Sequence, residues 1–214
     1  MNRIRYSVAM SLDGFIAGPK GEADWIIMDP EIDFAALFGQ FDAMLIGRKT
    51  YEAALGMGPG VGMGGMETFV FSRTLRQADH PKVRIVADGA KELLTGLKDR
   101  SGKDVWLMGG GELFRSLLDL GLVDTVEVAI VPVLLGDGIP LLQRPGDRAR
   151  LRLTAHRIYQ NSGIVALEYS VDRTPRGTLP PREPPPPREP PPPRETPPPR
   201  KSPPERRPRA PRGR

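Results

Sequence analysis

The 214-residue sequence contains no cysteine. The chain therefore has neither a disulfide framework nor a thiolate metal site, and this composition agrees with a reducing compartment. Histidine is scarce as well. The sequence contains only His80 and His156, and neither has a partner nearby in the sequence. No metal site is expected.

Long hydrophobic runs are also missing. No segment approaches the roughly 18 apolar residues that a membrane-spanning helix requires. The first ten residues, MNRIRYSVAM, hold only a brief apolar run, which is too short for the core of a signal peptide. We expect an unprocessed, soluble protein of the cytoplasm.

The last 40 residues differ in composition from the rest. Residues 175–214 contain 18 of the 25 prolines, 11 Lys or Arg and four Glu, so this tail carries a charge of +7. The whole chain carries +5, which leaves −2 for residues 1–174, a segment long enough to bury a hydrophobic core. We predict one folded domain over residues 1–174, with no nucleic-acid or membrane partner, and a disordered Pro/Arg-rich tail over residues 175–214.

Arginines recur every six residues in the tail, at Arg182, Arg188, Arg194, Arg200 and Arg206. A polyproline helix has about three residues per turn, so these arginines would share one edge of a rod. Such a rod could dock an aromatic groove or an acidic surface. However, acids or arginine occupy proline positions that basic-flanked PxxP ligands need. We interpret the tail as a solubilising spacer, and the sequence identifies no partner for it.

Apolar patterns alternate between strands and helices along residues 1–174. They predict strands at residues 4–10, 43–46, 68–71, 84–86, 104–108, 125–131, 151–159 and 164–171, and helices around residues 34–41, 49–55, 93–97 and 112–118. This alternation is typical of an α/β fold with a mixed, mainly parallel sheet and helices on both faces. The last two strands flank the polar turn 160–163 and should form an antiparallel hairpin at the sheet edge.

Three consecutive glycines, Gly109, Gly110 and Gly111, separate a predicted strand from the helix that begins at about Glu112. Glycine lacks a Cβ and lets the backbone come close to a ligand. The helix N-terminus then directs N–H groups with partial positive charge at that ligand. This pattern predicts a nucleotide phosphate site.

Two further clusters stand where predicted strands end. Gly47-Arg48-Lys49-Thr50 offers two cations and a hydroxyl at a helix N-terminus, which suits a pyrophosphate. Ser72-Arg73-Thr74 offers the hydroxyl and guanidinium that a ribose 2′-phosphate requires. The alternative is that Thr50 caps its own helix and the cations are solvated.

One glycine motif is misleading. Residues 60–65, GVGMGG, match the dinucleotide fingerprint GxGxxG by spelling. That fingerprint must follow a strand and open a helix, whereas this copy precedes a predicted strand. We interpret it as a loop.

Together these motifs resemble a known family. Five segments look like the reductase domain of riboflavin biosynthesis, the C-terminal half of the bifunctional deaminase-reductase (the RibD C-terminal domain). They are SLDGFIA at 11–17, WI at 25–26, PE at 30–31, GLVD at 121–124 and PVLLG at 132–136. GRKTYE at 47–52 and SR at 72–73 look closer to dihydrofolate reductase. The two enzymes share one fold, so the resemblance, which covers residues 3–171 in order, implies a dihydrofolate reductase-like three-layer fold.

The resemblance implies NADPH as the cofactor and a homodimer as the assembly. It implies that Arg48 and Thr50 lie beside the pyrophosphate, that Ser72 and Arg73 point toward the 2′-phosphate, and that the Gly109–Gly110 bond is cis. The full set of cofactor-binding candidates is Gly47, Arg48, Lys49, Thr50, Ser72, Arg73, Gly109, Gly110, Gly111 and Glu112.

Hydride transfer also needs an aligned substrate and a proton source. In dihydrofolate reductase one carboxylate on the first helix holds the pteridine, and counting back from Gly47 places that position at Glu31, beside Asp29 and Asp33. The alternative for Asp29 and Glu31 is stabilisation of a helix N-terminus. Asp13 would lie beside the nicotinamide, where it either contacts substrate or forms a turn with the glycine after it. Glu31 and Asp13 are the candidate catalytic residues.

The chain departs from both families. Ala129 and Phe114 stand where dihydrofolate reductases carry hydroxyl side chains, residues 47–50 are more basic than the riboflavin enzyme usually shows, and no deaminase half is present. We predict an NADPH-dependent reductase of a nitrogen heterocycle, with 5-amino-6-(5-phosphoribosylamino)uracil reduction in riboflavin synthesis ahead of dihydrofolate reduction. A third interpretation is a nucleotide-binding domain without turnover that carries a Pro-rich interaction tail.

Overall fold

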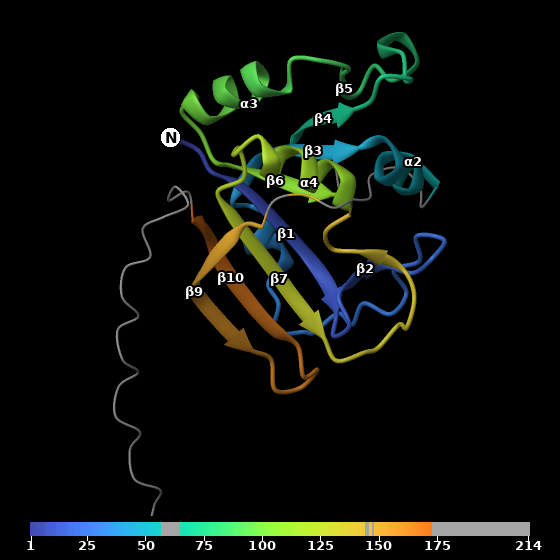
Figure 1. The fold of residues 1–214 in the computed structure, drawn as a ribbon, viewed down its shortest axis with the longest axis vertical. Helices are drawn as coiled ribbons and strands as arrows, with labels where there is room; N and C mark the ends of the chain where they lie inside the picture. The colour runs from blue at the N-terminus through green and yellow to red at the C-terminus, as the bar shows by residue number, and fades with distance from the viewer. Residues whose placement is uncertain (57–64, 144–145, 147, 173–214) are drawn as a thin grey trace, which may run out of the picture. The chain divides into compact units, whose positions relative to one another are not determined.

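The computed structural model describes residues 1–56, 65–143, 146 and 148–172. The chain divides into two units, Met1–Thr174 and Pro175–Arg214, and all the described residues belong to the first. An eight-stranded sheet in the order β5-β4-β3-β6-β1-β7-β10-β9 forms its centre (Figure 1). The GVGMGG motif lies outside the described residues except for Gly65.

The predicted strands are confirmed to within one or two residues at each end. They are β1 (Ile4–Ser11), β3 (Phe41–Gly47), β4 (Glu67–Phe71), β5 (Arg84–Val86), β6 (Asp104–Gly109), β7 (Thr125–Val131), β9 (Arg150–Ile158) and β10 (Val165–Asp172). The strands from β5 to β7 in the sheet pair in parallel. Strands β9 and β10 form the predicted antiparallel hairpin, with β9 at the edge. The sheet is therefore mixed and mainly parallel.

Helices cover both faces of the sheet. They are α1 (Phe34–Phe38), α2 (Arg48–Gly56), α3 (Ala90–Asp99) and α4 (Gly111–Asp119). Because side chains alternate along a strand, Leu45 packs into a core with α3 and α4, whereas Ile46 packs with Tyr51 of α2. On that second face, the rings of Phe38 and Trp106 lie 5.0 Å apart between α1 and β6. The three-layer arrangement follows from this alternation.

Helix α4 is followed by a glycine in the left-handed conformation. Gly121 has a positive φ of 67°. Its N–H donates to the Leu118 carbonyl, and the Leu122 N–H donates to the Leu117 carbonyl, each at 3.0 Å. This is the Schellman pattern, which satisfies carbonyls that the end of a helix leaves open.

Two details differ from the predictions. The first helix ends at Phe38, so Phe41 belongs to β3 instead, because Gly39 ends the helix and the chain turns into the sheet there. A small second sheet, β2 (Phe15–Ala17) with β8 (Ile139–Pro140), was not predicted. Strands this short carry too few residues for a period of two to show. No helix among the described residues is long and apolar enough to span a membrane.

Candidate functional site

The candidate site lies where the parallel strands end, at the point where the chain reverses its direction across the sheet. Strands β3 and β6 are neighbours. The chain leaves β3 through α2 toward β4, and leaves β6 through α4 toward β7. Because α2 and α4 cover opposite faces, their N-termini flank the ends of these two neighbouring strands, and we refer to this place as the crevice. Ligands of open α/β sheets bind in such a crevice.

Two of the predicted glycine clusters meet in this crevice. A Cβ on Gly47 would lie 3.5 Å from the Gly110 nitrogen and 3.6 Å from the Gly109 oxygen. A Cβ on Gly110 would lie only 3.0 Å from Thr50 Oγ1. The two backbones therefore approach closely, and the Thr50 hydroxyl lies beside Gly110.

Helix α4 begins without a side-chain cap. Its N-cap is Gly110, which has no side chain to accept from the first-turn N–H groups. The Gly109–Gly110 peptide bond is cis, as the resemblance implies. This helix end presents backbone donors with partial positive charge to the crevice.

Gly111, which the glycine motif predicts to approach a phosphate, lies against the backbone of another segment of the chain. A Cβ on Gly111 would lie 2.9 Å from the Pro140 carbonyl oxygen and 3.1 Å from that of Leu141. These are backbone atoms that cannot move aside. Close packing against the segment after β8 is therefore sufficient reason for glycine at this position, apart from any phosphate.

Each predicted phosphate-binding cation has a carboxylate within 4 Å. The pairs are Arg48 with Glu52 at 2.9 Å, Lys49 with Glu112 at 3.9 Å, and Arg73 with Asp88 at 3.9 Å. All six side chains are at least 40% exposed. Ion pairs this exposed contribute little stability, so a phosphate could replace the carboxylates at little cost.

The Ser72 hydroxyl makes hydrogen bonds within the turn that it begins. The buried hydroxyl accepts from the Thr74 and Leu75 N–H groups at 3.1 and 3.0 Å. The Ser72 N–H donates to the Val86 carbonyl at 3.0 Å, which fixes the turn after β4 beside the end of β5. The turn leaves the Arg73 side chain exposed beyond the carboxyl end of β4.

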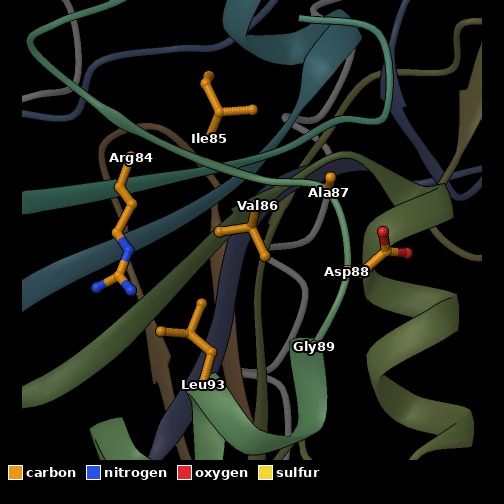
Figure 2. Close-up of a pocket in the computed structure, with 7 residues that line it drawn as sticks. All are labelled: Arg84, Ile85, Val86, Ala87, Asp88, Gly89 and Leu93. Carbon is orange, nitrogen blue, oxygen red and sulfur yellow. The ribbon is translucent and has the colours of Figure 1, made fainter. Parts of the chain in front are cut away.

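A hollow of about 300 Å³ lies between β5 and α3. Figure 2 shows Arg84, Val86 and Leu93 pointing into it, while Ile85 points to the other side of the strand. Asp88, the partner of Arg73, stands at its rim and is turned away from Leu93 (Figure 2). The hollow thus adjoins the predicted 2′-phosphate position.

Asp13 occupies the turn after β1 and is fully engaged in hydrogen bonds. Its carboxylate accepts from Ser11 Oγ at 2.6 Å and from the Leu135 and Gly136 N–H groups at 3.1 and 2.8 Å. The Ser11 hydroxyl and the Gly136 N–H lower the pKa of Asp13. Asp13 therefore holds the turn after β1 against the loop after β7, the role of the turn-forming alternative.

Three acids precede or cap α1, and each has a distinct role. Asp33 is the N-cap and accepts from the Ala36 N–H at 2.9 Å. Glu31 accepts from Arg157 at 3.3 Å and from Asn161 at 3.0 Å, which ties its loop to the β9–β10 hairpin. Asp29 and Glu31 precede the helix, whose first turn contains no acid, so they are not first-turn acids.

Asp29 is the buried member of this group, with 2% of its surface exposed. Its Oδ1 accepts from the Glu31 N–H at 2.8 Å. Oδ2 makes no hydrogen bond of good geometry within the described residues. The pKa of Asp29 is lowered, mainly by the nearby Ser162 hydroxyl and to a smaller degree by the Glu31 N–H. Asp29 shapes the loop, whereas Glu31, whose side chain is 43% exposed, can meet a ligand.

Sequence reasoning missed Asp88, Arg157 and Asn161. Asp88 follows a strand end just as Ser72 does, so the same signal could have found it. Arg157 and Asn161 reach Glu31 from about 130 positions away, and no local pattern marks such a contact.

Comparison with known proteins gives the same assignment as the motifs. The profile of the RibD C-terminal domain matches residues 2–165. An uncharacterised Bacillus subtilis protein, YyaP, is 35% identical over 178 residues, covering 78% of this chain and 94% of that protein.

Solved structures agree on the fold. A candidate riboflavin biosynthesis protein from Shewanella sp. PV-4 is 25% identical with a TM-score of 0.68, covering 81% of this chain and all of that one. Dihydrofolate reductase from Enterococcus faecalis, complexed with NADP(H), is 16% identical with a TM-score of 0.55, covering 79% and 94% of the two chains. The predicted dihydrofolate reductase-like fold is confirmed.

Proposed function

The chain belongs to the family of RibD C-terminal domains, a family of reductases, and we propose that it is an NADPH-dependent reductase of a nitrogen heterocycle in the cytoplasm. The first-ranked substrate is 5-amino-6-(5-phosphoribosylamino)uracil, ahead of dihydrofolate. The related Shewanella protein, assigned to riboflavin biosynthesis, supports that order.

One observation carries the proposal: Gly47, Thr50 and Gly110 meet at the crevice between the N-termini of α2 and α4. These residues fit a dinucleotide, because backbone N–H groups and a hydroxyl surround a place where two helix N-termini favour anions. We assign Arg73, which follows the end of the neighbouring strand β4, to the ribose 2′-phosphate. The enterococcal enzyme of the same fold carries NADP(H).

The opposite end of the crevice would receive the substrate. When bound, the nicotinamide supplies the hydride, and the protein must orient the two rings and exclude water. Strand β1 extends beyond the end of its neighbour β6 and ends at Ser11. We therefore assign the turn at Asp13 to the boundary of the substrate position. We assign Asp13 to positioning, since its carboxylate is already used by Ser11, Leu135 and Gly136.

Glu31 is the acid we assign to the substrate. It is exposed, and Arg157 and Asn161 fix its carboxylate from the hairpin. An oriented carboxylate can accept from ring N–H groups of a pyrimidine or pterin and can relay a proton through water. Asp29 is too buried for that contact.

The test uses the full-length protein. NADPH binding is titrated by nicotinamide fluorescence, and NADPH oxidation is then followed with the phosphoribosylaminouracil and, separately, with dihydrofolate. Saturable binding and turnover of one heterocycle would support the proposal. If neither NADPH nor NADH binds, the proposal fails; binding without turnover of either substrate would favour the non-catalytic interpretation.

We also propose that the protein forms a homodimer through β9 and β10. Leu151, Leu153 and Ile158 of the edge strand are exposed, and they pair across the hairpin with Val171, Tyr169 and Val165. Cross-strand partners share a face, so this face is an apolar surface at the edge of the sheet. Sedimentation of the wild type and of Leu153→Glu tests this: the variant should be monomeric, and a monomeric wild type would refute the dimer.

A further inference from the structure

The cofactor edge is balanced in charge. Arg48, Lys49 and Arg73 are each paired with an acid. NADPH differs from NADH only by a 2′-phosphate, and a guanidinium near the ribose adds affinity for that phosphate unless an acid beside it opposes the charge. The pair at that position is Arg73 with Asp88.

This pair differs in its geometry from the other two. Arg48 and Glu52 are neighbours on one helix, and Lys49 and Glu112 lie at the N-termini of α2 and α4. Arg73 and Asp88 instead follow the ends of adjacent strands β4 and β5, which the Ser72 N–H bond to Val86 holds together. Their side chains are 85% and 86% exposed, so both charges are available to a ligand.

The two side chains favour different ribose substituents. A carboxylate accepts a hydrogen bond from a ribose 2′-hydroxyl, whereas a guanidinium binds a 2′-phosphate. Asp88 also stands at the rim of the hollow between β5 and α3, next to apolar Val86 and Leu93. An adenosine that reached this hollow would bring its ribose between the two charges.

We propose that Asp88 opposes Arg73 at the ribose 2′ position, so that Asp88 lowers the preference of this reductase for NADPH over NADH. The inference rests on the proposed function, because it assumes a nicotinamide cofactor in this crevice. It assigns to Asp88 the control of cofactor choice.

The experiment measures the Kd of NADPH and of NADH for four full-length proteins: the wild type, Asp88→Asn, Arg73→Ala and Asp99→Asn. Asp99 is the matched control, because it is an exposed acid at the other end of α3. One unit charge acting on a phosphate about 4 Å away in water corresponds to a change of about three- to tenfold. The NADH-to-NADPH ratio of Kd should rise by that factor in Asp88→Asn, fall in Arg73→Ala and stay unchanged in Asp99→Asn.

The outcomes separate the two proposals. If the wild type binds cofactor but Asp88→Asn leaves the ratio unchanged, Asp88 does not control the choice, and the reductase proposal stands. If Asp88→Asn and Asp99→Asn raise the ratio equally, the change reflects net charge alone, and the inference is wrong. If neither cofactor binds the wild type, both proposals fail together.

Discussion

The two ends of the crevice are built in different ways. At the proposed phosphate end, the backbone of Gly47 lies against that of Gly109 and Gly110, and a Cβ on Gly110 would lie only 3.0 Å from Thr50 Oγ1. At the proposed substrate end, the carboxylates of Asp13, Asp29 and Glu31 accept hydrogen bonds that hold loops in place. The first end should be sensitive to added volume, and the second to lost charge.

Added volume should have the largest effect at Gly111. Gly111→Ala places a methyl group 2.9 Å from the Pro140 carbonyl oxygen, and overpacking of this kind costs about 3 kcal/mol of unfolding free energy. Urea unfolding followed by circular dichroism measures it. Gly96→Ala is the control, because it adds the same methyl in helix α3 with no atom within 4 Å, and it should stabilise by about 1 kcal/mol. Equal effects of the two variants would contradict the packing argument.

Loss of the Thr50 hydroxyl should weaken cofactor binding without unfolding the protein. Thr50→Val keeps the shape but removes the group that stands 3.0 Å from the Gly110 Cβ position. One hydrogen bond to a charged group corresponds to a change of about tenfold in the Kd of NADPH. Thr95→Val is the matched control on α3, where the hydroxyl binds only the Lys91 carbonyl. An unchanged Kd in Thr50→Val would remove Thr50 from the site.

Arg73 tests the phosphate end by charge alone. Arg73→Ala should lower the affinity for NADPH about fivefold relative to NADH, because an exposed guanidinium is partly screened by solvent. Fluorescence titration with both cofactors gives the ratio. If the ratio is the same as in the wild type, Arg73 does not contact the 2′-phosphate.

The stability that Asp13 contributes at the proposed substrate end should decrease at low pH. Hydrogen bonds lower the pKa of Asp13 in the folded state, so it contributes stability above its unfolded pKa of about 3.9, and that contribution is lost as the pH falls through the lower folded value. Asp13→Asn should therefore be less stable than the wild type at pH 7, and the difference should narrow below about pH 4. Urea midpoints at pH 7 and pH 3.5 measure this. A difference that does not depend on pH would show that the charge is unimportant.

Removal of the tail should have the smallest effect. If residues 175–214 are a spacer, a chain that ends at residue 174 binds NADPH with unchanged Kd and turns over substrate at the same rate. The control is the full-length protein at matched salt, because the tail carries a charge of +7. Loss of activity on deletion would make the tail part of the catalytic unit.

Local patterns were sufficient for most of the fold. Short apolar runs predicted the central strands of the main sheet, because a strand that is buried on both faces is apolar along most of its length. The apolar pattern did not predict β2 and β8, because these strands are only three and two residues long. The helix at residues 34–41 was predicted too long, since Phe41 is apolar in either assignment and only the sheet fixes its place.

The sequence by itself determined which residue types stand at the proposed phosphate end. Glycines and hydroxyls at strand ends are local signals, because backbone geometry and helix N-termini act over a few residues. Only the tertiary structure decided which charges oppose one another: Asp88 beside Arg73, Arg157 on Glu31, and Arg5 buried against Glu127 at 2.6 Å. Electrostatic and hydrogen-bond partners are set by distance in space, and the chain brings together residues that lie up to 130 positions apart.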